Sequence, residues 1–240
     1  MLIYTRSVFF NLIKMKSQLI TLSLAFMLIG ISARAQNTTG WDSTYRPPIY
    51  AGKVGQFKSF PKSKDDIIFL GNSIMTYTDW NELLGIKTAK NRGIPGDMTF
   101  GVLDRLENVI QGRPAKIFIE IGINDINRSV PDSLILRNYK RIISRIKAGS
   151  PSTKIYFHTL LPVNDTFASL KGKTAHILYI NSKLKEIAVQ EGITLIDLYP
   201  HFVDSTGMMN PKYVFDGLHP NELGYFIWAD VLKKGKYLTK

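Results

Sequence analysis

Runs of β-branched and other apolar residues alternate with amphipathic segments along most of this chain. Buried parallel strands have this composition, because helices cover both of their faces. The predicted strands are residues 67–70, 117–121, 155–159 and 194–196, with 87–91 as a weaker fifth. The predicted helices, each with one apolar face, are residues 98–110, 132–148, 176–190 and 223–232. This alternation predicts an α/β three-layer sandwich around a mostly parallel sheet of about five strands.

The first 35 residues have the pattern of a secretory signal peptide. Basic residues precede an apolar run at 19–31, and the sequence Ser32-Ala33-Arg34-Ala35 follows it. A retained membrane anchor is the alternative, but the run is short for a bilayer span of about 20 residues. We therefore expect cleavage after Ala35 and no stable membrane anchor afterwards. Residues 36–64 show no steady period and are expected to form an extended N-terminal arm over a single domain at 65–240.

The chain contains no cysteine, which excludes disulfides, thiol catalysis and a lipid-modified N-terminal cysteine. An exported protein without disulfides is typical of a bacterial envelope, so we expect a periplasmic or extracellular location. The net charge is +12, but the lysines are scattered and form no basic stripe interleaved with aromatic residues. A nucleic-acid partner is therefore not supported, although a basic surface would weakly favour acidic substrates.

Four short polar segments follow predicted strands or lie in loops, and together they contain the groups that acyl transfer needs. They are Gly71-Asn72-Ser73-Ile74, Gly93-Ile94-Pro95-Gly96, Gly122-Ile123-Asn124-Asp125 and Asp216-Gly217-Leu218-His219-Pro220. The first three follow strands of one parallel sheet, so they should lie at the same rim, where ligands bind in such folds. The set offers a hydroxyl nucleophile, glycine amides, a side-chain amide and a carboxylate close to an imidazole.

Each segment also has a purely structural interpretation. Ser73 could cap a helix, the glycines could form an ordinary turn, and Asn124 could belong to a turn. Asp216 and His219 could be surface residues of a loop, yet their spacing lets the carboxylate reach one imidazole nitrogen and leaves the other free. The other histidines are interpreted as structural, because none follows a carboxylate by three residues as His219 does; they are His158, His176 and His201. No cluster has metal-ligand spacing, so neither a metal nor a cofactor is predicted.

These four segments resemble the blocks of the SGNH/GDSL hydrolase family, and residues 91–106 resemble its acetylhydrolase-like branch. The resemblance implies a flavodoxin-like sandwich with strand order 2-1-3-4-5. It also implies that Ser73 is the nucleophile, with Asp216 and His219 completing a catalytic triad. The oxyanion hole would be formed by the amides of Ser73 and Gly96 and by the side chain of Asn124. The first block departs from the family's Gly-Asp-Ser, because Asn72 replaces the aspartate.

The expected function is an exported serine esterase that removes short acyl groups, acetyl in particular, from a carbohydrate. A lysophospholipase or short-chain lipase of the same family is one alternative. A catalytically weak relative that binds glycans is another, with Asn72 as the sign of lost activity. The particular sugar, the ester position and the oligomeric state are left open by the sequence.

Overall fold

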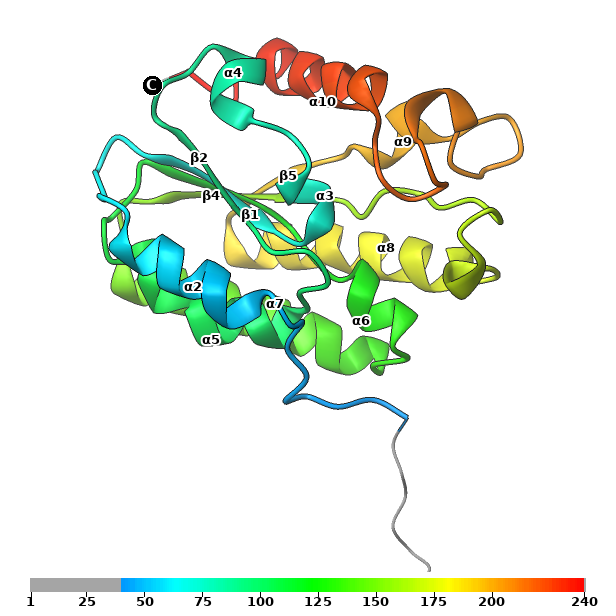
Figure 1. The fold of residues 1–240 in the computed structure, drawn as a ribbon, viewed down its shortest axis with the longest axis horizontal. Coiled ribbons are helices and arrows are strands. Elements are labelled where there is room, and N and C mark those ends of the chain that lie inside the picture. The colour runs from blue at the N-terminus through cyan, green and yellow to red at the C-terminus, as the bar shows by residue number, and fades with distance from the viewer. Residues whose placement is uncertain (1–39, 240) are drawn as a thin grey trace, which may run out of the picture. The chain divides into compact units, whose positions relative to one another are not determined.

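The computed structural model describes residues 40–239, and the chain from Gly40 onward is one compact unit. Figure 1 shows a central sheet with helices on both faces. The strands are β1 (Ile67–Gly71), β2 (Ala89–Gly93), β3 (Lys116–Glu120), β4 (Lys154–His158) and β5 (Thr194–Ile196). The helices are α2 (Tyr50–Ser59), α3 (Ser73–Thr76), α4 (Trp80–Leu84), α5 (Thr99–Ile110), α6 (Ile123–Asn127), α7 (Asp132–Gly149), α8 (Thr174–Glu191), α9 (Tyr199–Phe202) and α10 (Glu222–Lys234). The predicted α/β class is confirmed.

All four strand pairings are parallel, and the strand order is β2-β1-β3-β4-β5. This confirms the order implied by the family resemblance. The last residue of β1, Gly71, is in register with Gly93 on one side and with Glu120 on the other. The loops that leave β1, β2 and β3 therefore start side by side, which brings three of the four polar segments to one rim of the sheet.

The sheet is covered by α4 and α10 on one face and by α2, α5, α7 and α8 on the other (Figure 1). On the α4 and α10 face, Phe69 lies between the rings of Trp80 and Phe118, with centroids 4.1 and 5.0 Å away. Trp80 in turn meets Trp228 of α10 at 5.3 Å. Stacked and edge-to-face rings at these distances are favourable beyond the area that they bury, so this aromatic column fixes how α4 and α10 sit on the strands.

Residues 40–64 differ from the expected extended arm, because they include the helix α2. The segment has two glycines and a weak apolar face, so its sequence predicts no helix. Tertiary contacts stabilise it instead. Phe57 is buried beneath the guanidinium of Arg92, and the Tyr50 hydroxyl donates a hydrogen bond of 2.6 Å to the carbonyl of Gly101 in α5.

The limits of the predicted strands and helices agree with the structure to within about two residues. The helix at 50–59 and the short helices α3, α4, α6 and α9 were not predicted. The weak strand predicted at 87–91 is β2, shifted two residues toward the C-terminus. Two charged residues, Lys116 and Glu120, begin and end β3 and are both buried. Glu120 lies within the predicted strand at 117–121, whereas Lys116 lies just before it. Within residues 40–239 no helix combines the length and apolar character that crossing a membrane requires. The expected signal peptide at 1–35 lies outside the described residues.

Candidate active site

Ser73 lies at the rim of the sheet, immediately after β1. It is the first residue of α3, and Asn72 before it caps the helix by accepting a 2.9 Å hydrogen bond from the Ile74 amide. The asparagine at the position of the family's aspartate therefore accepts a hydrogen bond in this turn. Its Nδ2 atom is buried and has no hydrogen-bond partner among the described residues. Because Asn72 serves as the cap, the side chain of Ser73 is free for another role.

Asp216 and His219 are joined in the loop that precedes α10. The Nδ1 atom of His219 lies 2.6 Å from Asp216 Oδ2. The other carboxylate oxygen, Oδ1, accepts hydrogen bonds from the backbone amides of Leu218 at 3.0 Å and of His219 at 2.8 Å. Burial raises the pKa of Asp216, but the hydrogen bonds from His219 and Leu218 together lower it below the ordinary value. The carboxylate is therefore held ionised and aimed at one side of the imidazole ring.

The structure brings Ser73 and His219 together from positions far apart in the chain. The Ser73 Oγ atom lies 2.9 Å from His219 Nε2. Since Nδ1 faces a carboxylate, the imidazole carries its proton on Nδ1 and leaves Nε2 as the acceptor for the serine hydroxyl. Ser73 is 6% exposed, so this contact is largely shielded from water. The three residues that the sequence pattern singled out form one hydrogen-bonded chain.

Gly96 and Asn124 lie on the two loops that border the Ser73 turn. Gly96 follows β2 and has a φ of +77°, a conformation that glycine adopts without strain. Asn124 is in the first turn of α6, after β3, and its Nδ2 donates a 2.9 Å hydrogen bond to the carbonyl of Asp97. That contact fixes the amide beside the Gly96 turn, and the second hydrogen on Nδ2 remains available for another acceptor.

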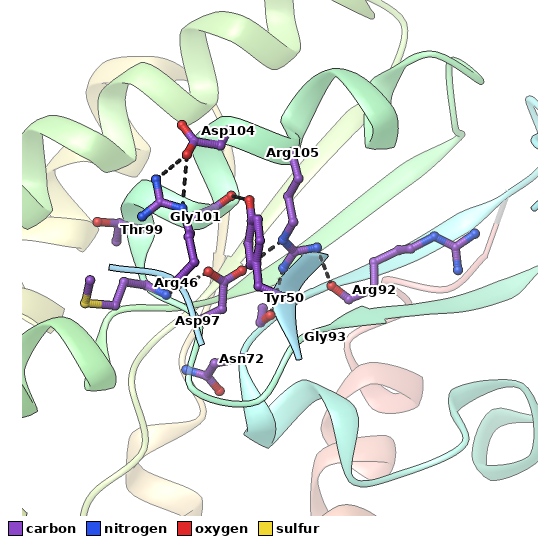
Figure 2. A network of polar contacts seen from close by, with 12 residues as sticks. Arg46, Tyr50, Asn72, Arg92, Gly93, Asp97, Thr99, Gly101, Asp104 and Arg105 are labelled. Carbon is purple, nitrogen blue, oxygen red and sulfur yellow. Dashed lines mark hydrogen bonds and ion pairs between the residues drawn. The ribbon is translucent and has the colours of Figure 1, made fainter. Parts of the chain in front are cut away.

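A buried ion pair beneath this rim was not anticipated from the sequence. Arg105 Nε lies 2.9 Å from Asp97 Oδ2, and both side chains are almost fully buried. The same guanidinium donates to the carbonyls of Arg92 at 2.8 Å and Gly71 at 3.0 Å. Figure 2 shows Arg105 reaching from α5 to Asp97 and Arg92, with Asn72 below Asp97. One side chain thus ties together the ends of β1 and β2 and the loop that carries Gly96.

Asp125 holds the loop after β3 through a contact with α5. Its carboxylate accepts hydrogen bonds from the Thr99 amide, at 3.1 and 3.2 Å, and from the Thr99 hydroxyl, at 2.6 Å. Burial raises the pKa of Asp125 to about 7, against the lowering effect of these bonds. The contact joins the loop that contains Asn124 to the start of the helix that follows Gly96, and so makes the geometry of the rim more rigid.

The remaining histidines lie outside this arrangement. His158 is buried in β4, where the Trp228 Nε1 atom is 3.3 Å from its Nε2, and burial lowers its pKa to about 3. His176 contacts Asp132 at 3.0 Å on the surface, and His201 is exposed in α9. Across residues 40–239, no three histidine, aspartate or glutamate side chains gather in a way that could hold a metal ion.

Three aromatic rings surround the imidazole of His219. Phe215 stacks on it with a centroid distance of 5.6 Å, the centroid of Tyr77 lies 5.1 Å away, and Phe167 forms an edge-to-face pair with it at a centroid distance of 6.0 Å. No sequence pattern predicts a role for these rings, because they come from three separate loops. They hold the imidazole in its plane and leave its Nε2 atom facing Ser73.

Comparison with known proteins places the chain in a family. The GDSL-like Lipase/Acylhydrolase family matches residues 69–227. The platelet-activating factor acetylhydrolase IB subunit alpha2 proteins of Rattus norvegicus and Homo sapiens are each 30% identical over 167 residues, covering 67% of this chain and 71% of each relative. A Streptococcus pneumonia protein described provisionally as a platelet activating factor has a TM-score of 0.72 at 29% identity, over 79% of this chain and 92% of that chain. A GDSL-like lipase from Bacteroides thetaiotaomicron shares the fold, with a TM-score of 0.68 at 22% identity over 78% of this chain and 96% of that chain. The chain therefore belongs to the GDSL-like lipase/acylhydrolase family of carboxylic ester hydrolases.

Proposed function

We propose that this protein is an exported serine esterase that removes short acyl groups, acetyl in particular, from a carbohydrate. The observation that carries the catalytic part is the chain of hydrogen bonds from the Ser73 hydroxyl through His219 to Asp216. In this order a serine can be deprotonated as it attacks, because the imidazolium that forms is stabilised by an ionised carboxylate.

The reaction has two halves. His219 Nε2 takes the proton from Ser73 Oγ, and the oxygen attacks the ester carbonyl carbon. The negative charge on the carbonyl oxygen is stabilised by the amides of Ser73 and Gly96 and by the side-chain amide of Asn124. When the intermediate collapses, His219 gives its proton to the departing alcohol, and an acyl-enzyme remains on Ser73. Water, deprotonated by His219, then attacks the acyl-enzyme and releases the free acid.

Two observations favour a short acyl group and a carbohydrate. Relatives at 30% identity carry the name acetylhydrolase, which supports acetyl as the group removed. The signal-peptide pattern at 1–35 supports export, and polysaccharides are abundant ester substrates outside the cell. Cleavage after Ala35 would leave Gln36 as the first residue, and mass spectrometry of the protein secreted by a bacterial host tests this directly.

The decisive experiment is hydrolysis of p-nitrophenyl acetate by the wild-type protein and by Ser73→Ala. We expect the variant to lose at least about a thousandfold in kcat, because the nucleophile is gone. Ser182→Ala, which removes an exposed hydroxyl from α8, is the matched control and should keep full activity. Undiminished hydrolysis by Ser73→Ala would refute the proposal.

Further measurements separate the alternatives. Asn124→Ala should lower kcat by about 10²–10³ through loss of one oxyanion donor. A series of nitrophenyl esters with lengthening acyl chains tests the acyl preference, since a lipase would gain activity with longer chains. Stoichiometric labelling of Ser73 by a fluorophosphonate is expected for an esterase. Absence of labelling in the folded protein would favour the glycan-binding alternative.

A further inference from the structure

A groove of about 550 Å³ runs along the surface beside His219. It is formed by the segment between α3 and α4, by α4 itself, by the loop before α10 and by the first turns of α10. Its lining residues are Tyr77, Thr78, Asp79, Glu82, Leu83, Phe215, Pro220, Asn221, Glu222, Tyr225 and Phe226. Two of these, Tyr77 and Phe215, also pack against the His219 ring, so the groove begins next to the imidazole.

The position of the groove indicates which part of an ester it would receive. The loops that carry Gly96 and Asn124 contribute nothing to its lining, so the groove extends away from the oxyanion donors. In the proposed mechanism His219 must protonate the departing alcohol, which therefore leaves on the imidazole side. The alcohol portion of the ester, and not the acyl group, is the part that points into this groove.

Three of the lining rings are unusually accessible for large apolar side chains. Tyr77 is 48% exposed, Phe215 is 63% exposed and Phe226 is 60% exposed. Exposed aromatic residues that gather in one depression mark binding sites more often than single ones do. Their faces suit the C–H surface of a sugar ring and are also attractive to a cation.

The charge of the groove is opposite to that of the whole chain. Its charged lining residues are Asp79, Glu82 and Glu222, and no lysine or arginine lines it. None of the three carboxylates forms an ion pair with another residue of the described range 40–239. A local negative field of this kind acts on a bound ligand more strongly than a net charge of +12 spread over the whole surface.

We propose that this groove binds the alcohol portion of the substrate and selects uncharged or positively charged alcohols over anionic ones. The proposal rests on the esterase function above and narrows its substrate class to esters of neutral or amino sugars, as opposed to acidic sugars. It also reverses the weak preference for acidic substrates that the overall charge favoured. The aromatic faces provide contact area, and the carboxylates accept hydrogen bonds from hydroxyl or ammonium groups and repel carboxylates.

A set of three acetate esters that differ chiefly in the charge of the alcohol tests this. They are acetylcholine, its uncharged isostere 3,3-dimethylbutyl acetate, and the anionic acetate ester of 3-hydroxypropanesulfonate. At low ionic strength we expect kcat/KM to fall in that order, by about tenfold or more between the cation and the anion. The ratio should shrink in about 0.5 M salt, where exposed charges are screened.

The variant Glu82→Gln/Glu222→Gln should lower the ratio of cationic to uncharged ester by about threefold or more. Glu186→Gln changes one exposed carboxylate on α8, across the sheet, and should leave the ratio unchanged. A variant that folds poorly would lose activity on all esters alike and would not move the ratio. Two results would overturn the inference while leaving the esterase function intact. One is that the anionic ester is hydrolysed fastest. The other is that the double variant leaves the ratio of cationic to uncharged ester unchanged. If the wild-type protein hydrolyses none of the three esters, it is the proposed function that fails.

Discussion

Glu120 is the buried group from which we expect the largest pH effect on stability. It ends β3 beside Gly71, it is fully buried, and both of its carboxylate oxygens lack a hydrogen-bond partner among the described residues. Burial without compensation raises the pKa of Glu120 to about 8, from an ordinary value of 4.5. The folded protein therefore keeps this carboxyl protonated at neutral pH, whereas the unfolded chain has released the proton.

Whether stability rises or falls with pH depends on how many protons the folded and unfolded states bind. Between pH 4.5 and pH 8 the folded state binds one more proton than the unfolded state at this position, so stability falls as the pH rises. Each pH unit within that window changes the free energy of unfolding by about 1.4 kcal/mol. From pH 5 to pH 8, this single carboxyl group should therefore remove about 3–4 kcal/mol of stability.

The substitution Glu120→Gln replaces the carboxyl group by an uncharged group of the same shape. Its stability relative to wild type should increase by about 3–4 kcal/mol between pH 5 and pH 8. Any cost of burying the new amide is the same at both pH values and cancels in this comparison. Urea unfolding of both proteins at four pH values measures the effect. For a slope of about 2 kcal/mol per M, the unfolding midpoint of the variant should shift by about 1.5–2 M relative to wild type.

The comparison between variants is essential, because other buried groups titrate in the same range. The lowered pKa of His158 makes stability rise with pH between 3 and 6.5, which offsets Glu120 in the wild-type profile. Glu186→Gln, at an exposed position of α8, is the control and should show no such trend. The expected effect of Glu120 is refuted if the free energies of unfolding of Glu120→Gln and wild type differ by the same amount at pH 5 and at pH 8.

Three further outcomes are expected. Arg105→Ala leaves the buried carboxylate of Asp97 without its partner and should cost about 3–5 kcal/mol in urea unfolding; a cost below about 1 kcal/mol would contradict the ion pair. Gly122→Ala places a Cβ at a φ of +133° and against the Tyr139 hydroxyl, so it should destabilise by more than about 1 kcal/mol. Tyr139→Phe in the same chain should recover part of this loss, and a lack of recovery would show that the backbone angle alone is responsible. Asp216→Asn should lower kcat on p-nitrophenyl acetate by about 10³–10⁴ with little change in unfolding midpoint, and near-normal turnover would show that the imidazole needs no carboxylate.

The fold class and the positions of the candidate residues could be predicted because they depend on local patterns. Strand–helix alternation identifies a parallel sheet, and residues just after consecutive strands of such a sheet must meet at one rim. This is why Ser73, Gly96 and Asn124 could be assigned to the same rim before any coordinates were known. Asp216 and His219 were recognised by spacing within one loop, which is also a local property.

Other features depend on contacts between distant segments, and the sequence pattern contained no signal for them. The helix α2 has weak helical propensity and is held by Tyr50 and Phe57 through contacts with other elements. Arg105 and Asp97 look like ordinary surface charges in the sequence, yet both are buried. The negative groove beside His219 combines side chains from two loops and two helices, so no single stretch of sequence displays it.

The amino-acid sequence alone thus determined the layered architecture, the order in which the chemical groups occur and the rim at which three of them meet. Only the tertiary structure decided which nitrogen of His219 faces Ser73, which charges are buried and where the groove beside His219 lies. The physical reason is the distance along the chain over which each kind of interaction acts. Backbone periodicity and turn preferences act over a few residues and are visible in one segment, whereas burial, pKa shifts and surface charge arise from atoms that the folded chain brings together.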